Sequence, residues 1–319
     1  MLNEFEIIEY YFKSKQLNNH YDPILGIGDD AAIISIDKKE KLAVSMDTLV
    51  EEVHFSRDAS PEDIARKSLL VNLSDMAAMG AIPRWSTLSL TLPNYNHDWL
   101  EEFSNEFNNL LTQYSLSLIG GDLTKGPLSI TIQMHGVVPD GKFLCRSGAR
   151  PGDLIYVTGE LGAAAYTLRY LKNSSKNLKP TDKEFKRLYQ PEPRIKTGLE
   201  IRDIATSCID ISDGLFLDLS HILKASKVGA EIKLSDIPYT ETLKKLNKDL
   251  AIELALAGGD DYELCFTIPS SISQSDLEKM ITTVKIFQIG RISETSCELN
   301  LLDNNEKIYE LKSTGYQHF

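Results

Sequence analysis

Residues 139–153 have the sequence PDGKFLCRSGARPGD and separate two long segments in which apolar strands alternate with helices. Glycine, proline and charged residues dominate this stretch, and such a composition favours a loop or a domain linker. A chain of 319 residues also exceeds the usual size of a single hydrophobic core, so two domains are expected. We therefore predict an N-terminal domain over residues 1–138 and a C-terminal domain over residues 139–319.

The segment before this linker contains the most clearly marked helix of the chain. Ser60 suits the N-cap, Pro61 suits the first helical position, and Gly80 ends the run IARKSLLVNLSDMAAM. This run is apolar on most of its circumference, which predicts a buried helix. Around it the patterns predict helices over 3–15 and 98–114, and strands over 42–47, 88–92 and 129–138.

The segment after the linker repeats the alternation. Its patterns predict strands over 153–159, 207–212, 230–234, 263–268 and 284–292, and helices from Leu161, after Pro193, over 214–226 and over 239–256. Mixed strands and helices in both halves indicate an α+β or an α/β layered fold, and the patterns alone leave both open.

Composition narrows the range of functions. The net charge of −12 argues against a nucleic-acid partner, and no apolar run approaches the roughly 20 residues that a membrane helix needs. The N-terminal sequence MLNEFEIIEYYFKSK is typical of an amphipathic helix rather than a secretory signal, so we expect a cytoplasmic protein without a membrane partner. The four cysteines form no CxxC pair, which indicates neither a zinc site nor a disulfide framework.

Aspartates recur beside glycines and at the ends of predicted strands. They are Asp29, Asp30, Asp47, Asp122, Asp210, Asp213, Asp260 and Asp261. Because aspartate and glycine favour turns, each position alone is compatible with a purely structural role. Taken together, they would place carboxylates at the rim of a sheet, where oxygen ligands of a metal ion are commonly found.

Asp75 differs from these because it lies inside the predicted buried helix. A buried carboxylate needs a partner, and no lysine or arginine lies three or four residues away. Asn72, one turn earlier, can donate a hydrogen bond but cannot neutralise the charge. A bound cation or a distant arginine would do so. Oxygen ligands without a cysteine or histidine cluster favour Mg²⁺.

Magnesium-binding carboxylates indicate nucleotide or phosphoryl-transfer chemistry. The motifs GxxxxGK[ST], HRD, DFG and GxGxxG are all absent from the sequence. The glycine-rich turns expected at GIGDDAA (26–32) and IGGDLTKG (119–126) could still present backbone N–H groups to phosphate. Arg146 is a candidate phosphate contact, although a solvated surface charge is an equally good interpretation.

Eight segments occur in the order GIGDDAA, SMDTLVEEVHF, NLSDMAAMGAIP, LIGGDLTKGPLSITIQMHG, RSGARPGDLIYVTG, IDISDGL, GGDDYELCF and GYQHF. Their sequences and order resemble the bacterial thiamine-monophosphate kinase family over almost the whole chain. The resemblance implies a two-domain α+β chain of the PurM-like architecture. Its N-terminal mixed sheet would pair across a homodimer, and its C-terminal domain would have α/β layers. ATP would bind in a cleft between the domains.

The resemblance also implies a role for individual residues. The ligands of several Mg²⁺ ions would be Asp30, Ser45, Met46, Asp47, Asp75, Asp122, Asp210 and Asp213, of which Asp75, Asp122, Asp210 and Asp213 form the catalytic group. ATP would contact Gly121, Asp122, Arg146 and Ser212, and the substrate would contact His54, Asp260 and Tyr316. Two positions depart from the family pattern. Met46 stands where relatives often carry threonine and would bind metal through its backbone carbonyl, and Asp260 replaces a longer glutamate.

The activity implied by the resemblance is the ATP-dependent phosphorylation of thiamine monophosphate to thiamine diphosphate, with ADP as the second product. The acceptor phosphate is already ionised at neutral pH, so no strong general base is required. The alternatives are a sister ATP-dependent enzyme, such as selenophosphate synthetase or HypE, and a non-catalytic nucleotide or metal sensor. The first cysteine is Cys145, whereas selenophosphate synthetase would carry a reactive one earlier, and the chain ends at Phe319 without the cysteine tail expected of HypE.

Overall fold

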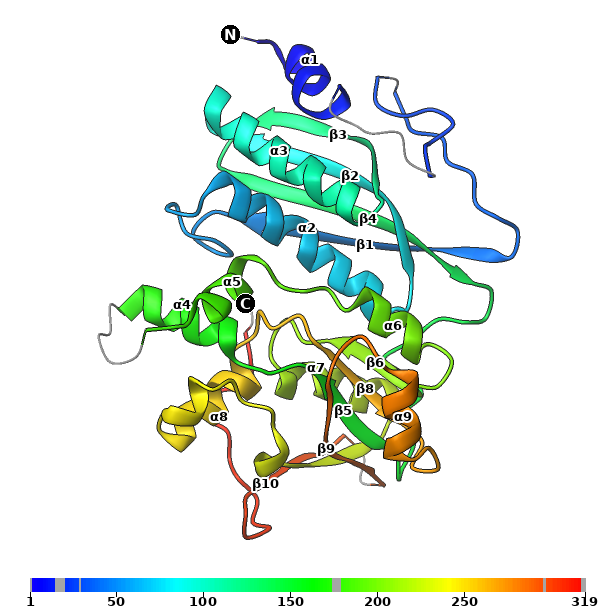
Figure 1. Ribbon diagram of the computed structural model, residues 1–319, viewed down its shortest axis with the longest axis vertical. Helices are drawn as coiled ribbons and strands as arrows, with labels where there is room; N and C mark the ends of the chain where they lie inside the picture. The colour runs from blue at the N-terminus through cyan, green and yellow to red at the C-terminus, as the bar shows by residue number, and fades with distance from the viewer. Residues whose placement is uncertain (1, 15–20, 29, 174–178, 295–296, 317–319) are drawn as a thin grey trace. The chain divides into compact units, whose positions relative to one another are not determined.

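The computed structural model describes residues 2–14, 21–28, 30–173, 179–294 and 297–316 (Figure 1). The chain forms two compact units. The N-terminal unit comprises Met1–Met76 and Ala81–Gly141, and the C-terminal unit comprises Ala77–Gly80 and Lys142–Phe319. The domain division at 138/139 stays a prediction. Within the described ranges, no helix combines the length and apolar character needed to cross a membrane.

The N-terminal unit is built on a four-stranded mixed sheet. Its strands are β1 (Glu40–Val50), β2 (Ile82–Leu92), β3 (Ser117–Lys125) and β4 (Ser129–Pro139), in the order β1-β4-β2-β3. β4 runs antiparallel to β1 and β2, whereas β2 and β3 are parallel. The helical segments are α1 (Glu4–Ile7), the π-helical turn η1 (Ile8–Lys13), α2 (Pro61–Ala78) and α3 (His97–Gln113).

Helices α2 and α3 cover one face of this sheet (Figure 1). The predicted helix after Ser60 is confirmed: Ser60 Oγ accepts the N–H of Asp63 at 3.2 Å, and Gly80 adopts a φ of 61° just beyond the last turn. The close approach of α2 to the sheet requires Gly136, because a Cβ there would lie 2.8 Å from the sulfur of Met76. This contact identifies the face of β4 that lies under the helix.

The opposite face of the sheet carries an exposed apolar row on the edge strand β1. Side chains alternate along a strand, so Leu42, Val44 and Met46 project away from the helices. They are 42%, 50% and 61% exposed. Elsewhere on this face Trp85 packs with Ile34 of the N-terminal segment.

The C-terminal unit contains a six-stranded mixed sheet. Its strands are β5 (Leu154–Thr158), β6 (Ser207–Asp210), β7 (Gly229–Lys233), β8 (Leu264–Ile268), β9 (Ile286–Ser293) and β10 (Leu299–Leu302), in the order β10-β7-β9-β5-β8-β6. The helices are α4 (Ala163–Asn173), α5 (Asp182–Tyr189), α6 (Ile195–Ile201), α7 (Leu215–Ser226), α8 (Lys248–Ala257) and α9 (Gln274–Met280).

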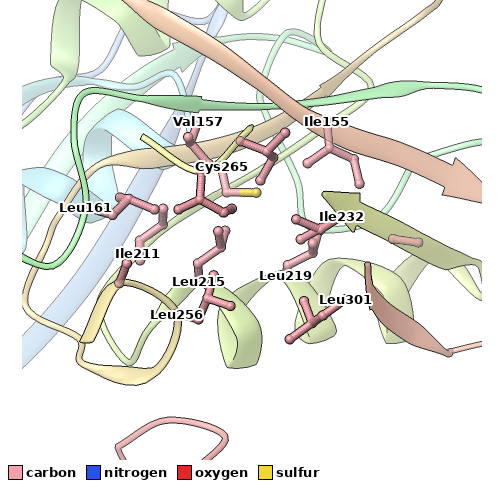
Figure 2. Packing of buried hydrophobic residues seen from close by; sticks show 14 of the residues in the cluster. Ile155, Val157, Leu161, Ile211, Leu215, Leu219, Ile232, Leu256, Cys265 and Leu301 are labelled. Carbon is pink, nitrogen blue, oxygen red and sulfur yellow. The ribbon is translucent and has the colours of Figure 1, made fainter. Parts of the chain in front are cut away.

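Both faces of this sheet are buried. Figure 2 shows the core on one face, where Ile155 and Val157 of β5 lie opposite Leu215 and Leu219 of α7. Tyr156 points the other way and belongs to a second cluster with residues of α6 and α9. A sheet with helices on both sides requires strands that are apolar on both faces, which explains the continuous apolar runs of β5 and β8.

Several local predictions are wrong. The glycine-rich turn expected at residues 119–126 lies mostly within β3, because Gly121 allows β3 to pair closely with β2: a Cβ there would lie 1.9 Å from the carbonyl oxygen of Leu88. The helix expected over 239–256 begins only at Lys248, after a short 3-10 turn at Leu243–Lys245. Helix α5 and strand β10 were not predicted at all.

Candidate functional site

Strand β1 directs two candidate metal ligands toward the helical face of the sheet. Ser45 and Asp47 share the orientation of buried Leu49, whereas the side chain of Met46 projects to the opposite face. Only the backbone carbonyl of Met46 remains available for the role predicted for that residue. Ser45 Oγ is buried and makes no hydrogen bond within the described residues.

Helix α2 adds Asn72 and Asp75 beside this strand. The amide oxygen of Asn72 accepts the backbone N–H of Asp47 at 3.2 Å, and its nitrogen donates to the carbonyl of Ser68 at 3.0 Å. Asn72 is fully buried, but Asp75 is only partly buried. The expectation of a deeply buried Asp75 is therefore wrong, because its side chain keeps some contact with solvent, although its neighbours Ser74 and Met76 are buried.

The loop after β1 holds His54 in a defined orientation. Its Nδ1 accepts the backbone N–H of Val50 at 3.0 Å, so the neutral ring carries its proton on Nε2, where it can be donated to a ligand. Lys67 of α2 is 2% exposed and donates from Nζ to the carbonyl of His54 at 3.1 Å. Sequence reasoning missed Lys67, because nothing local indicates which carbonyl a helical lysine reaches.

Three other candidate residues of the N-terminal unit line one pocket. Asp30, Gly121 and Asp122 border a pocket of about 780 Å³ between the N-terminal helical segment and β3. The structure thus brings the GIGDDAA and IGGDLTKG motifs together, although about 90 residues separate them. Asp29 lies outside the described residues.

In the C-terminal unit, the loop between β6 and α7 carries Asp210, Ser212 and Asp213. Oδ2 of Asp218 accepts the backbone N–H groups of Ser212, Asp213 and Gly214 at 3.0, 3.1 and 3.1 Å. Burial, followed by the negative charges of Asp210 and Asp213, raises the pKa of Asp218 to about 8. One carboxylate therefore shapes the whole loop, and sequence reasoning missed it because Asp218 looks like an ordinary first-turn helix residue.

Asp260 and Tyr316 converge on the same loop. The backbone N–H of Asp260 donates to the carbonyl of Ser212 at 2.8 Å, and that of Tyr316 donates to the carbonyl of Asp213 at 3.1 Å. The hydroxyl of Tyr262 donates to Asp260 Oδ1 at 3.1 Å. Asp260 has a φ of 61° and Tyr262 a φ of 51°, a left-handed conformation that is unfavourable for a bulky residue. Three segments distant in sequence are thereby fixed around Asp213.

Arg146 lies beside the C-terminal end of helix α7. Its carbonyl accepts a hydrogen bond from Ser226 Oγ at 3.2 Å, and the residue itself is exposed. Burial and then the positive charge of Arg146 lower the pKa of His221, which the negative charge of Asp213 partly counteracts. His221 thus lies within the electrostatic reach of both predicted site residues.

Glu263 of the GGDDYEL segment forms a buried ion cluster with Arg187 and Arg194. Glu263 is fully buried and accepts four hydrogen bonds: from Arg194 Nε at 2.6 Å and Nη2 at 2.7 Å, from Arg187 at 2.7 Å and from Thr158 at 2.6 Å. Its backbone carbonyl accepts the N–H of Ile211 at 2.8 Å. Glu263 consequently connects the Asp260 segment to the loop after β6.

The residues of the N-terminal unit fit a hard cation by their donor chemistry. Ser45 and Asp47 supply oxygen only, and the unsatisfied hydroxyl of Ser45 is available as a ligand. No three His, Cys, Asp or Glu side chains in the described part of the chain lie close enough together to form a metal site by themselves. The magnesium ligand set stays a prediction.

Comparisons with known proteins cover nearly the whole chain. The model for AIR synthase related protein, N-terminal domain, matches residues 28–138, and that for the C-terminal domain matches residues 150–295. Thiamine-monophosphate kinase of Escherichia coli strain K12 is 46% identical over 99% of this chain and 98% of its own length. The two domain models and the mixed sheets confirm the predicted two-domain α+β fold.

Solved structures agree with this comparison. The crystal structure of thiamine-monophosphate kinase from Stenotrophomonas maltophilia K279a has a TM-score of 0.85 and 40% identity, covering 96% of this chain and 98% of that one. The structure of AaThiL complexed with AMPPCP and TMP has a TM-score of 0.77 and 30% identity, covering 100% of this chain and 97% of that one.

Proposed function

Because the chain belongs to the thiamine-monophosphate kinase family, we propose that it transfers the γ-phosphoryl group of ATP to thiamine monophosphate, with thiamine diphosphate and ADP as products. The observation that carries this proposal is the convergence of Ser212, Asp213, Asp260 and Tyr316, which backbone hydrogen bonds hold together. These residues are the predicted ATP, metal and substrate contacts of the C-terminal unit. The complex of AaThiL with AMPPCP and TMP supports the choice of substrates.

In the proposed reaction, the side chains of this protein position the two substrates and interact with their charges. The terminal phosphate of thiamine monophosphate is ionised at neutral pH and attacks the γ-phosphorus directly, so no residue has to remove a proton. His54 Nε2–H donates to the acceptor phosphate, since Nδ1 is occupied by Val50. Asp260 and Tyr316 hold the rest of the substrate, where the ring of Tyr316, 46% exposed, can face the thiazolium cation.

The ATP contacts are Gly121, Asp122, Arg146 and Ser212. Arg146 is exposed and can form hydrogen bonds with phosphate oxygens.

Oxygen ligands for several Mg²⁺ ions complete the proposed site. They are Asp30, Ser45, the Met46 carbonyl, Asp47, Asp75, Asp122, Asp210 and Asp213. When bound, magnesium supplies charge neutralisation between two polyanions that would otherwise repel each other. The unsatisfied hydroxyl of Ser45 supports this assignment.

We also propose that the protein is a homodimer joined through the exposed face of the N-terminal sheet. Leu42, Val44 and Met46 form a continuous apolar row there, and burial of such a row is favourable. Both ring nitrogens of His135, which pairs with Val44, are buried and have no hydrogen-bond partner among the described residues. A second copy would supply the missing contacts. The cytoplasmic location stays a prediction.

The direct test is an acceptor assay with purified protein, ATP, Mg²⁺ and thiamine monophosphate, in which chromatography quantifies thiamine diphosphate and ADP. We expect equal amounts of both products, and none without the acceptor. ATP binding without ADP release would indicate a sensor instead. Failure to form thiamine diphosphate across a range of pH and salt would refute the proposal.

A further inference from the structure

The backbone around Tyr262 is held against the loop after β6 by three hydrogen bonds. The N–H of Tyr262 donates to the carbonyl of Ile211 at 2.8 Å, and the N–H of Ile211 donates to the carbonyl of Glu263 at 2.8 Å. Two residues earlier, the N–H of Asp260 donates to the carbonyl of Ser212 at 2.8 Å. The position of the Tyr262 side chain is therefore tied to the loop that carries predicted ATP and metal contacts.

The four side chains from Asp260 to Glu263 divide between the core and the surface. Asp261 is buried and accepts the N–H of Gly162 with both carboxylate oxygens, at 2.9 and 3.1 Å, and Glu263 is fully buried among its arginine partners. Asp260 and Tyr262 are only partly buried, and the Tyr262 hydroxyl donates to Asp260 Oδ1 at 3.1 Å. These two are thus the side chains of the segment that a substrate can reach from solvent.

The backbone conformation of Tyr262 also indicates that its side chain is used. Asp260 has a φ of 61° and Tyr262 a φ of 51°. A left-handed conformation costs free energy, and for a bulky residue it is found mainly where the surrounding structure holds it, often at ligand sites. Glycine would adopt this conformation without strain, so a tyrosine here points to a role for the hydroxyl or the ring.

We propose that Tyr262 is a positioning residue for the substrate contact Asp260, an inference that rests on the proposed function. The Tyr262 hydroxyl holds the Asp260 carboxylate in one orientation before thiamine monophosphate binds. A carboxylate that is already oriented loses less conformational entropy on binding, so its contact with the cationic substrate becomes stronger. Tyr262 acts through Asp260 and does not contact the reacting phosphates.

A purely structural role for this hydroxyl would give a different result, and the same unit supplies a matched control. The hydroxyl of Tyr309 donates to Asp249 Oδ1 at 3.2 Å, and neither residue belongs to the predicted site. Tyr262→Phe and Tyr309→Phe each remove one oxygen atom from a Tyr–Asp pair and keep the ring. Because water competes for hydrogen bonds between partly exposed side chains, neither substitution should change the unfolding midpoint much.

The test measures steady-state kinetics of both variants, together with calorimetry of thiamine monophosphate binding. Tyr262→Phe should raise the KM for thiamine monophosphate and weaken its binding about tenfold, as expected for the loss of one hydrogen bond to a charged group. It should leave kcat, the KM for ATP and the Mg²⁺ requirement unchanged. Tyr309→Phe should match the wild type in every one of these measurements.

A double-mutant cycle tests whether Tyr262 acts through Asp260. Asp260→Ala should itself weaken thiamine monophosphate binding, because it removes the proposed substrate contact. In that background Tyr262→Phe should have no further effect, since the hydroxyl no longer has a carboxylate to orient. A stability effect of Tyr262 that was independent of Asp260 would instead add to the first loss.

Three results would overturn the inference: an unchanged KM for thiamine monophosphate in Tyr262→Phe, an equal rise in the KM for ATP, or a further tenfold loss in the Asp260→Ala background. If the wild type bound thiamine monophosphate but formed no thiamine diphosphate, the proposed function would fail, and calorimetry would still decide the role of Tyr262. A wild-type protein that did not bind thiamine monophosphate would overturn both.

Discussion

Replacement of Glu263 by glutamine should destabilise the C-terminal unit strongly. The carboxylate is fully buried and accepts hydrogen bonds from two guanidinium groups and from Thr158, all at 2.6–2.7 Å. A neutral amide cannot compensate Arg187 and Arg194, and its own NH₂ group would face donors. Removal of one partner from a buried ion pair costs about 3–5 kcal/mol.

The assay is chemical and thermal unfolding, followed by circular dichroism, of Glu263→Gln and of the control Glu192→Gln. Glu192 contacts the same Arg194 at 2.8 Å but is 68% exposed, so its loss should cost less than about 1 kcal/mol. For a unit of this size, the loss expected for Glu263→Gln lowers the unfolding midpoint by roughly 10 °C. A change within about 1 kcal/mol of the wild type would refute the assigned role of the cluster.

The same cluster predicts a dependence on pH. Burial by itself would raise the pKa of Glu263, but the hydrogen bonds and charges of Arg194 and Arg187 outweigh it and hold the pKa below its ordinary value of 4.5. A carboxyl whose pKa is lowered in the folded state stabilises the protein above the unfolded-state pKa and loses that contribution as the pH falls. The stability difference between wild type and Glu263→Gln should therefore be constant near neutral pH and shrink below about pH 4.5.

Three further substitutions test the rest of the site. Asp75→Asn should lower kcat about 100-fold or more with an unchanged circular dichroism spectrum, and wild-type turnover would remove Asp75 from the proposed metal site. Gly121→Ala should cost about 1–3 kcal/mol in urea unfolding, because the new Cβ would meet a carbonyl at 1.9 Å, whereas Gly120→Ala, with 3.9 Å to its nearest neighbour, should be nearly neutral. Met46→Glu should convert the proposed dimer to monomers in light scattering, whereas Met280→Glu, at a similarly exposed methionine, should not.

Local sequence patterns predicted most helices and strands because their signals are local. The helix after Ser60 has an N-cap, a first-turn proline and a terminal glycine, all within about 20 residues, and the structure has the same boundaries. The prediction at residues 119–126 was wrong because two glycines and an aspartate are typical of a turn. Pairing with β2 overrides that preference, and no local signal reports such pairing.

Only part of the candidate site could be predicted from the sequence. The order of the motifs identified the family and the residues to examine, including Ser212, Asp213 and Asp260. The groups that position them were not found, because Asp218 and Glu263 look like ordinary acidic residues of a helix and a strand. Their roles depend on which donors surround them after folding.

The aspartate and glycine motifs, the two-domain α+β organisation and the family follow from the amino-acid sequence by itself, because they depend on residue types and their order. Tertiary structure decided which motifs meet. GIGDDAA and IGGDLTKG line one pocket of the N-terminal unit, and GGDDYEL is hydrogen-bonded to IDISDG at the loop after β6. It also decided that Glu263 is a buried partner of two arginines about 70 residues away. The physical reason is that periodicity and turn preference act over a few residues, whereas burial and charge pairing depend on segments that only folding brings together.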